Sequence, residues 1–123
     1  MRKHRAYPYQ NAGNIQENIP ETGLYDHGPN PYVFNIEQET LQNKNFRIVI
    51  WTGTYMQLTL MSINPGEDIG LEMHPDVDQF VRIEQGRGVI MMGNSIDNLD
   101  FQQMVSKNYA IIIPAGIWHN LTN

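Results

Sequence analysis

The sequence predicts an all-β fold built from a succession of short strands. From residue 46 onward, runs of β-branched and aromatic residues recur at intervals of about ten residues, with Gly, Asn, Asp and Pro between them. No segment has the length and periodicity of a long helix. Evenly spaced short strands are typical of a β-sandwich or β-barrel, and a chain of 123 residues fits one such domain.

The composition excludes several classes of protein. The chain has no cysteine, so disulfides, thiolate catalysis and Cys-ligated metals are excluded, and any metal would bind nitrogen and oxygen. A net charge of −5, with only a small basic cluster at the start, does not suit nucleic-acid binding. No run approaches the roughly 18 apolar residues of a membrane span, and the start lacks the apolar core of a signal peptide. We therefore expect a cytoplasmic protein without a nucleic-acid or membrane partner.

Residues 1–31 are predicted to form a flexible N-terminal arm. They are rich in Asn, Gly, Pro and Tyr and show no apolar periodicity, so they can bury little surface. Single-domain barrels often exchange such arms between subunits, so we expect a homodimer. We expect the arm's two histidines, His4 and His27, to be solvated surface residues rather than metal ligands.

The barrel domain is predicted over residues 32–123. Asn35, with Gln38 three residues later, has the pattern of a helix N-cap and predicts one or two helical turns. The runs FRIVIWTG and YMQLTLMSI predict a strand pair that turns near Gly53. Further strands are predicted at QFVRIE, GVIMM, FQQMV and YAIIIP.

The segment Glu72-Met73-His74 indicates a metal site. Side chains alternate between the two faces of a strand, so Glu72 and His74 are expected on the same face, where they can bind one ion.

The spacing of residues around this segment resembles the two sequence motifs of the cupin superfamily. The first motif corresponds to Gly66, Glu72, His74, Gln79 and Gly86, and the second to Asn108, Pro114, Gly116, His119 and Asn123. The family's first histidine is replaced by Glu72, its glutamate by Gln79, and the first glycine of its second motif by Asn108. Asparagine is the non-glycine residue that best tolerates a positive φ, so Asn108 suits that position.

The resemblance implies a jelly-roll, or double-stranded β-helix, barrel and four metal ligands: Glu72, His74, Gln79 and His119. Two imidazoles and one carboxylate suit Fe(II) and also accept Mn, Ni or Zn, and Gln79 can add an amide oxygen. The ligand charge of −1 is the same as in the family's set of three histidines and one glutamate. Because cupins normally continue past the second motif, the barrel is expected to lack its last C-terminal strand, either through truncation of the sequence or because a partner strand completes the sheet.

Within the superfamily, the chain resembles small single-domain bacterial proteins labelled mannose-6-phosphate isomerase-like. This favours a metal-dependent isomerase or lyase acting on a small carbonyl or sugar-like molecule, with a dioxygenase as a variant. The alternative is a non-catalytic cupin that binds a small ligand or has a structural role. In that case Glu72, His74 and Gln79 would form a metal-free polar network.

The sequence does not single out a catalytic base. The acidic candidates are predicted as loop or outward-facing charges: Glu67, Asp76, Asp78 and Glu84. The cations of the barrel are predicted on outer faces, which disfavours a phosphorylated substrate: Arg47, Arg82, Arg87 and Lys107. Arg82 and Glu84 are expected to form a surface pair, and Gln57 is a candidate for supporting the metal ligands.

Overall fold

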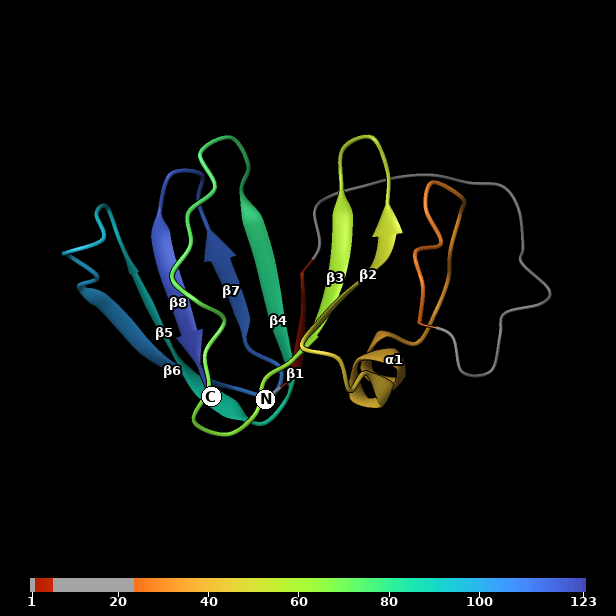
Figure 1. Ribbon diagram of the computed structural model, residues 1–123, viewed down its shortest axis with the longest axis horizontal. Coiled ribbons are helices and arrows are strands. Elements are labelled where there is room, and N and C mark those ends of the chain that lie inside the picture. The colour runs from red at the N-terminus through yellow and green to blue at the C-terminus, as the bar shows by residue number, and fades with distance from the viewer. Residues whose placement is uncertain (1, 6–23) are drawn as a thin grey trace.

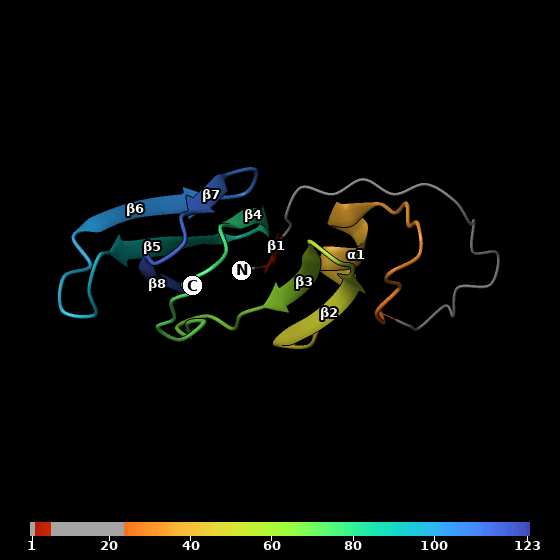
Figure 2. The same cartoon turned by 90° about the horizontal axis from the view of Figure 1, so that it is seen from above.

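The computed structural model describes residues 2–5 and 24–123 as two antiparallel sheets and one short helix, the jelly-roll arrangement that the sequence predicts. The elements are β1 (Arg2–Arg5), α1 (Ile36–Gln42), β2 (Arg47–Thr52), β3 (Gln57–Ser62), β4 (Gln79–Gln85), β5 (Arg87–Gly93), β6 (Phe101–Ser106), β7 (Ala110–Ile113) and β8 (Trp118–Thr122). One sheet has the order β2-β3-β1-β4-β7 and the other β6-β5-β8. Figures 1 and 2 show the smaller sheet at one side of the molecule, with β2, β3 and α1 at the other.

Strand β1 occupies the middle of the larger sheet. It pairs antiparallel with β3 along one edge and with β4 along the other (Figure 1). Its sequence, RKHR, has no apolar alternation that would indicate a strand. It is a strand because its backbone pairs with both neighbours. The rest of the predicted arm up to residue 23 lies outside the described residues, and the domain boundary at residue 31 stays a prediction.

The predicted helix cap and hairpin are present. The N–H of Gln38 donates to the Asn35 side chain at 2.9 Å and begins helix α1. The N–H of Gly53 donates to the Met56 carbonyl at 2.9 Å and closes the turn between β2 and β3. Among the described residues, no helix is long and apolar enough to cross a membrane.

Two buried clusters fill the interior. The first lies between the two sheets: Val81, Ile83, Ile90, Val105, Ile111, Ile113 and Leu121. The second joins β2 and β3: Ile50, Trp51, Leu58 and Leu60. On β4 and β8 the residues of the first cluster alternate with others, so Gln79 and His119 are on the same faces as Val81 and Leu121. The candidate metal ligands on these strands thus belong to the rim of the first cluster.

The connection between β3 and β4 is held against β8. Isolated bridges join Asp68 to Thr122 and Glu72 to His119, and the N–H of Ile69 donates to the Leu121 carbonyl at 3.0 Å. In Figure 1 this connection passes in front of β8. Residues about fifty positions apart in sequence are thereby brought side by side.

One prediction about the arm is wrong, because His27 is buried. Its side chain is only 4% exposed and stacks on Tyr32, with ring centroids 4.0 Å apart. Burial lowers the pKa of His27 below its ordinary value, although the charges of Glu39 and Asp26 act in the opposite direction. His27 therefore belongs to the packing of the 24–34 segment on the β2–β3 side of the molecule.

The predicted pair of Arg82 and Glu84 is present, but only Arg82 is at the surface. Arg82 Nε donates to Glu84 Oε1, and the Glu84 side chain is almost completely buried. The guanidinium also donates to Asn108 Oδ1 at 3.0 Å. The pair thus connects β4 to the turn before β7, and it has a structural role.

Candidate metal centre

Three predicted ligands meet in the structure: Glu72, His74 and His119. Their candidate ligand atoms all lie within 4.8 Å of one another. Oε1 of Glu72 is 3.1 Å from Nε2 of His119 and 3.7 Å from Nε2 of His74. Ligand atoms that share an ion at about 2.0–2.2 Å lie about 3.0–3.6 Å apart, so the Glu72–His119 separation is in this range and the Glu72–His74 separation is slightly above it.

Backbone pairing positions the three side chains. Glu72 and His119 exchange two N–H···O bonds of 3.0 and 2.9 Å, which fixes them directly opposite each other. His74 follows two residues after Glu72, and its carbonyl accepts the N–H of Gly116 at 2.8 Å. Gly116 has a φ of 83°, which favours glycine at this turn. The two motifs therefore meet through main-chain hydrogen bonds.

The hydrogen bonds of His119 determine which ring nitrogen faces the site. Nδ1 lies 3.1 Å from the carbonyl oxygen of Ile117, which can only accept, so Nδ1 carries a proton. In a neutral ring, Nε2 then presents a lone pair to a carboxylate oxygen of Glu72 at 3.1 Å. Two lone pairs facing each other repel, and a proton or a metal ion between them removes the repulsion. A carbonyl that orients the distal nitrogen of a histidine is a common arrangement in metal sites.

The position of His74 favours a metal ion over a proton. Nε2 of His74 is buried and has no hydrogen-bond partner among the described residues. One proton can serve only one histidine–carboxylate pair, whereas one cation can serve all three groups. The side chain of His119 is fully buried, but those of Glu72 and His74 are 23% and 35% exposed. The cluster is therefore closed on the β8 side and open beside Glu72 and His74.

Gln79 is placed at the inner start of β4. It pairs with Ile113 of β7 and is only 2% exposed. Both atoms of its side-chain amide lack a hydrogen-bond partner in the described part of the chain. An unpaired buried amide costs about 1–3 kcal/mol, so Gln79 fits a position where a ligand or metal supplies the missing interaction. Its role as a fourth ligand stays a prediction.

Other predicted residues lie away from the three ligands or are already engaged. Gln57 does not support the metal ligands: it is exposed at the start of β3 and donates to Thr52 Oγ1 at 3.2 Å. Asp78 Oδ1 accepts the N–H of Ala115 at 2.9 Å, which holds the loop before β8. Lys107 pairs with Glu37 at 3.3 Å on the surface.

One functional group was missed from the sequence, the Ile117 carbonyl that orients His119. A backbone oxygen carries no signal in residue type, and only the position of residue 117 two places before the histidine could have indicated it.

These motifs and their geometry are those of a cupin. The family model described as Cupin domain matches residues 59–123, and the chain belongs to this family. The match includes all four predicted ligands.

A similar solved structure supports the fold, and the printed names of the similar proteins state no activity. A crystal structure of BH2720 from Bacillus halodurans is similar with a TM-score of 0.80 and 60% identity, over 80% of this chain and 75% of that one. The uncharacterized protein YrkC of Bacillus subtilis is 58% identical over 81% of this chain and 54% of its own length. The uncharacterized protein L612 of Acanthamoeba polyphaga mimivirus is 45% identical over 75% of this chain and 56% of its own length. The chain thus spans about half the length of these curated relatives.

Proposed function

We propose that this protein is a metal-dependent cupin that acts on a small carbonyl or sugar-like molecule by isomerase or lyase chemistry. The observation that carries the proposal is the convergence of three ligand atoms on one point, with His119 Nε2 directed at Glu72 Oε1. The donor set of two imidazoles and a carboxylate accepts Mn, Fe, Ni or Zn.

Different residues of the chain would bind the metal and orient the substrate. A bound divalent ion would supply Lewis-acid chemistry toward a carbonyl oxygen. Glu72, His74 and His119 would hold that ion, and the exposed side of Glu72 and His74 leaves an approach for the substrate. The buried amide of Gln79 would bind the ion or orient the substrate oxygen.

The general base is not assigned. Two of the four acidic candidates already have partners, since Asp78 accepts the Ala115 N–H and Glu84 is paired with Arg82. The other two, Glu67 and Asp76, are exposed on the loop before β4.

Metal content and turnover in matched variants test the proposal. Protein expressed with Mn, Fe, Ni and Zn supplied is expected to contain about one equivalent of metal per chain. His74→Ala is expected to remove it. Gln79→Leu is expected to weaken binding by about tenfold, as loss of a supporting polar group does in other metal sites. Gln57→Leu is the matched control and is expected to keep full metal content, because Gln57 contacts Thr52 instead.

Activity is then measured on a panel of aldoses and keto acids. Turnover that disappears in His74→Ala would support the enzyme proposal. Wild-type protein without any transition metal would contradict it and favour a non-catalytic cupin with a metal-free Glu72–His119 pair.

We also propose that the protein is a homodimer in the cytoplasm, with small molecules as its partners. Strand β1 is separated in sequence from the rest of the larger sheet, so it can be exchanged between two copies. Light scattering after size exclusion tests the dimer, and cell fractionation tests the location.

A further inference from the structure

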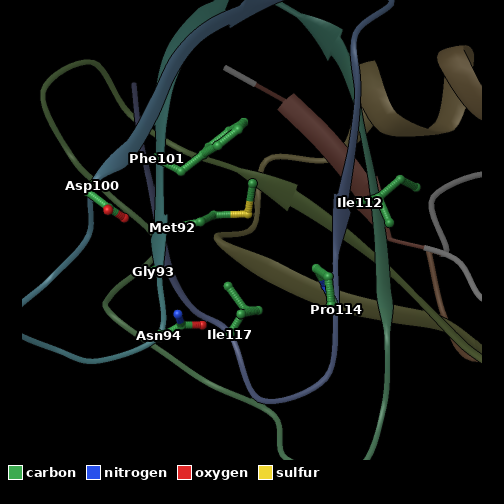
Figure 3. A pocket seen from close by; sticks show the side chains of 8 residues that line it. All are labelled: Met92, Gly93, Asn94, Asp100, Phe101, Ile112, Pro114 and Ile117. Atoms are coloured by element: carbon green, nitrogen blue, oxygen red, sulfur yellow. The ribbon is translucent and has the colours of Figure 1, made fainter.

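An apolar cavity opens between strands β5, β6 and β7. Its volume is about 390 Å³, within the usual range for small-ligand pockets. Figure 3 shows Met92, Phe101 and Ile117 on one side of this space, with Ile112 and Pro114 on the other. A second cavity of about 130 Å³ shares Met92 and Phe101 and continues along β6 and β7. The space between the sheets is therefore not completely filled by the core.

None of the four predicted ligands lines the cavity, but neighbouring residues connect the cavity to the candidate metal centre. Met92 is the cross-strand partner of His119 in the pairing of β5 with β8, and paired residues project to the same face. Ile117, which precedes β8, supplies the carbonyl that holds His119 Nδ1. Pro114 follows Ile113, the residue paired with Gln79. Met92 is thus paired with a predicted ligand, Ile117 is two positions from the same ligand, and Pro114 follows the strand partner of another.

The lining has little polar character and no positive charge. Its apolar side chains include Met92, Phe101, Pro114 and Ile117, and the polar groups are Asn94 and Asp100. No Lys, Arg or His side chain lines it in the described residues. A phosphate or carboxylate would lose hydration there without a cation to replace it, and Asp100 would repel it. A sugar would leave several hydroxyls without partners.

We infer that the substrate is a carbonyl compound with an uncharged apolar substituent, such as an aryl or branched alkyl group, seated in this cavity. This inference rests on the proposed metal centre, which would bind the oxygen atoms at the other end of the molecule. Phe101 is the best single determinant, because it lines the cavity and is on the same face of β6 as the buried Val105, yet is 52% exposed. An apolar ring against it would cover that surface.

Binding of three probes to metal-loaded protein tests the inference by calorimetry. Acetylacetone and benzoylacetone share the same dicarbonyl group and differ in a phenyl ring, and mannose 6-phosphate is the charged sugar comparison. Benzoylacetone is expected to bind at least about tenfold more tightly than acetylacetone, because burial of the ring is favourable by more than 1.4 kcal/mol. Mannose 6-phosphate is expected to bind weakest.

Two variants on β6 locate the effect. Phe101→Ser is expected to reduce the preference for benzoylacetone to within about threefold, with unchanged metal content. Met104→Ser is the control: Met104 is 63% exposed and does not line the cavity, so the full preference should remain. Equal binding of the two diketones to metal-loaded wild type, or tighter binding of mannose 6-phosphate, would overturn the inference.

A probe that needs no metal distinguishes failure of the proposed metal site from failure of the cavity to bind an apolar group. Metal content is measured in every sample, and metal-free protein is titrated with toluene while methyl resonances are followed by NMR. Shifts at Met92 and Ile117, without shifts at Met104, would support the apolar seat even if no metal bound. Absence of those shifts would overturn it. If metal is present but benzoylacetone is not preferred, the proposed metal-dependent function is not contradicted, but the inferred apolar substrate class is.

Discussion

The His119 ring is both oriented by hydrogen bonds and buried, as a metal ligand requires. Its Nδ1 is held by the Ile117 carbonyl and its Nε2 faces Glu72, while its side chain is completely buried. His74 reaches the same carboxylate oxygen from a position that is 35% exposed. The two histidines are therefore equivalent as candidate ligands but not as structural residues.

Alanine variants separate these roles. His74→Ala and His119→Ala are both expected to abolish metal binding. In metal-free protein, His119→Ala should lower the free energy of unfolding by about 2–4 kcal/mol, because it leaves a cavity and an unpaired carbonyl, whereas His74→Ala should cost less than about 1 kcal/mol. Urea unfolding and elemental analysis measure both effects. Metal retained in either variant, or equal stability losses, would contradict this assignment.

His27 predicts a pH dependence of stability. Its pKa is lowered in the folded protein, chiefly by burial, so the folded state binds its proton less readily than the unfolded state. The stabilisation is present above the unfolded pKa of about 6.5 and is lost as the pH falls through the folded pKa. The free energy of unfolding of metal-free protein should therefore fall more steeply from pH 7.5 to 5 in wild type than in His27→Gln. Parallel curves for the two proteins would argue against this role of His27.

At the scale of elements, the turn between β6 and β7 depends on Asn108. Its φ is 73°, in the left-handed region, and its side chain accepts a hydrogen bond from Arg82. Asn108→Val is expected to destabilise the protein by about 1–2 kcal/mol, because a β-branched residue is strained in this conformation. Asn108→Gly should cost less, since glycine removes the strain and loses only the hydrogen bond. Thermal unfolding of both variants measures the difference, and equal losses would show that backbone strain is not the cause.

The barrel elements could be predicted from the sequence because their signals are local. Evenly spaced runs of β-branched and aromatic residues identified β2 to β7, Asn35 marked the start of α1, and Asn108 occupies the positive φ expected of its position. Strand β1 could not be predicted, since RKHR has no pattern of its own and pairs only because β3 and β4 leave it a place. The burial of His27 was missed for a related reason, because its neighbours Tyr25 and Tyr32 pack against it through contacts that no periodicity reveals.

The candidate site was predictable in part. Motif spacing identified the residues that meet, Glu72, His74 and His119. It could not indicate the Ile117 carbonyl, the open side of the cluster or the cavity beside Met92, because these depend on how the loops pack.

At the scale of the whole molecule, the candidate site joins the loop before β4 to β8. A metal bound by Glu72 and His74 on one segment and His119 on the other would stabilise only the folded chain. Linkage predicts that the free energy of unfolding rises by about 2.7 kcal/mol at a free metal concentration one hundred times Kd. The melting temperature should rise with metal in wild type and not in His74→Ala. An equal rise in both proteins would indicate binding elsewhere.

The central claim is that one divalent ion is bound by Glu72, His74 and His119. The most direct test is anomalous diffraction at the metal edge from crystals of protein expressed with Mn, Fe, Ni and Zn. The account predicts one strong peak about 2.0–2.3 Å from His74 Nε2, His119 Nε2 and a Glu72 carboxylate oxygen. A fully supplied crystal without a peak between these atoms, or with Glu72 and His119 joined by a direct hydrogen bond instead, would contradict it.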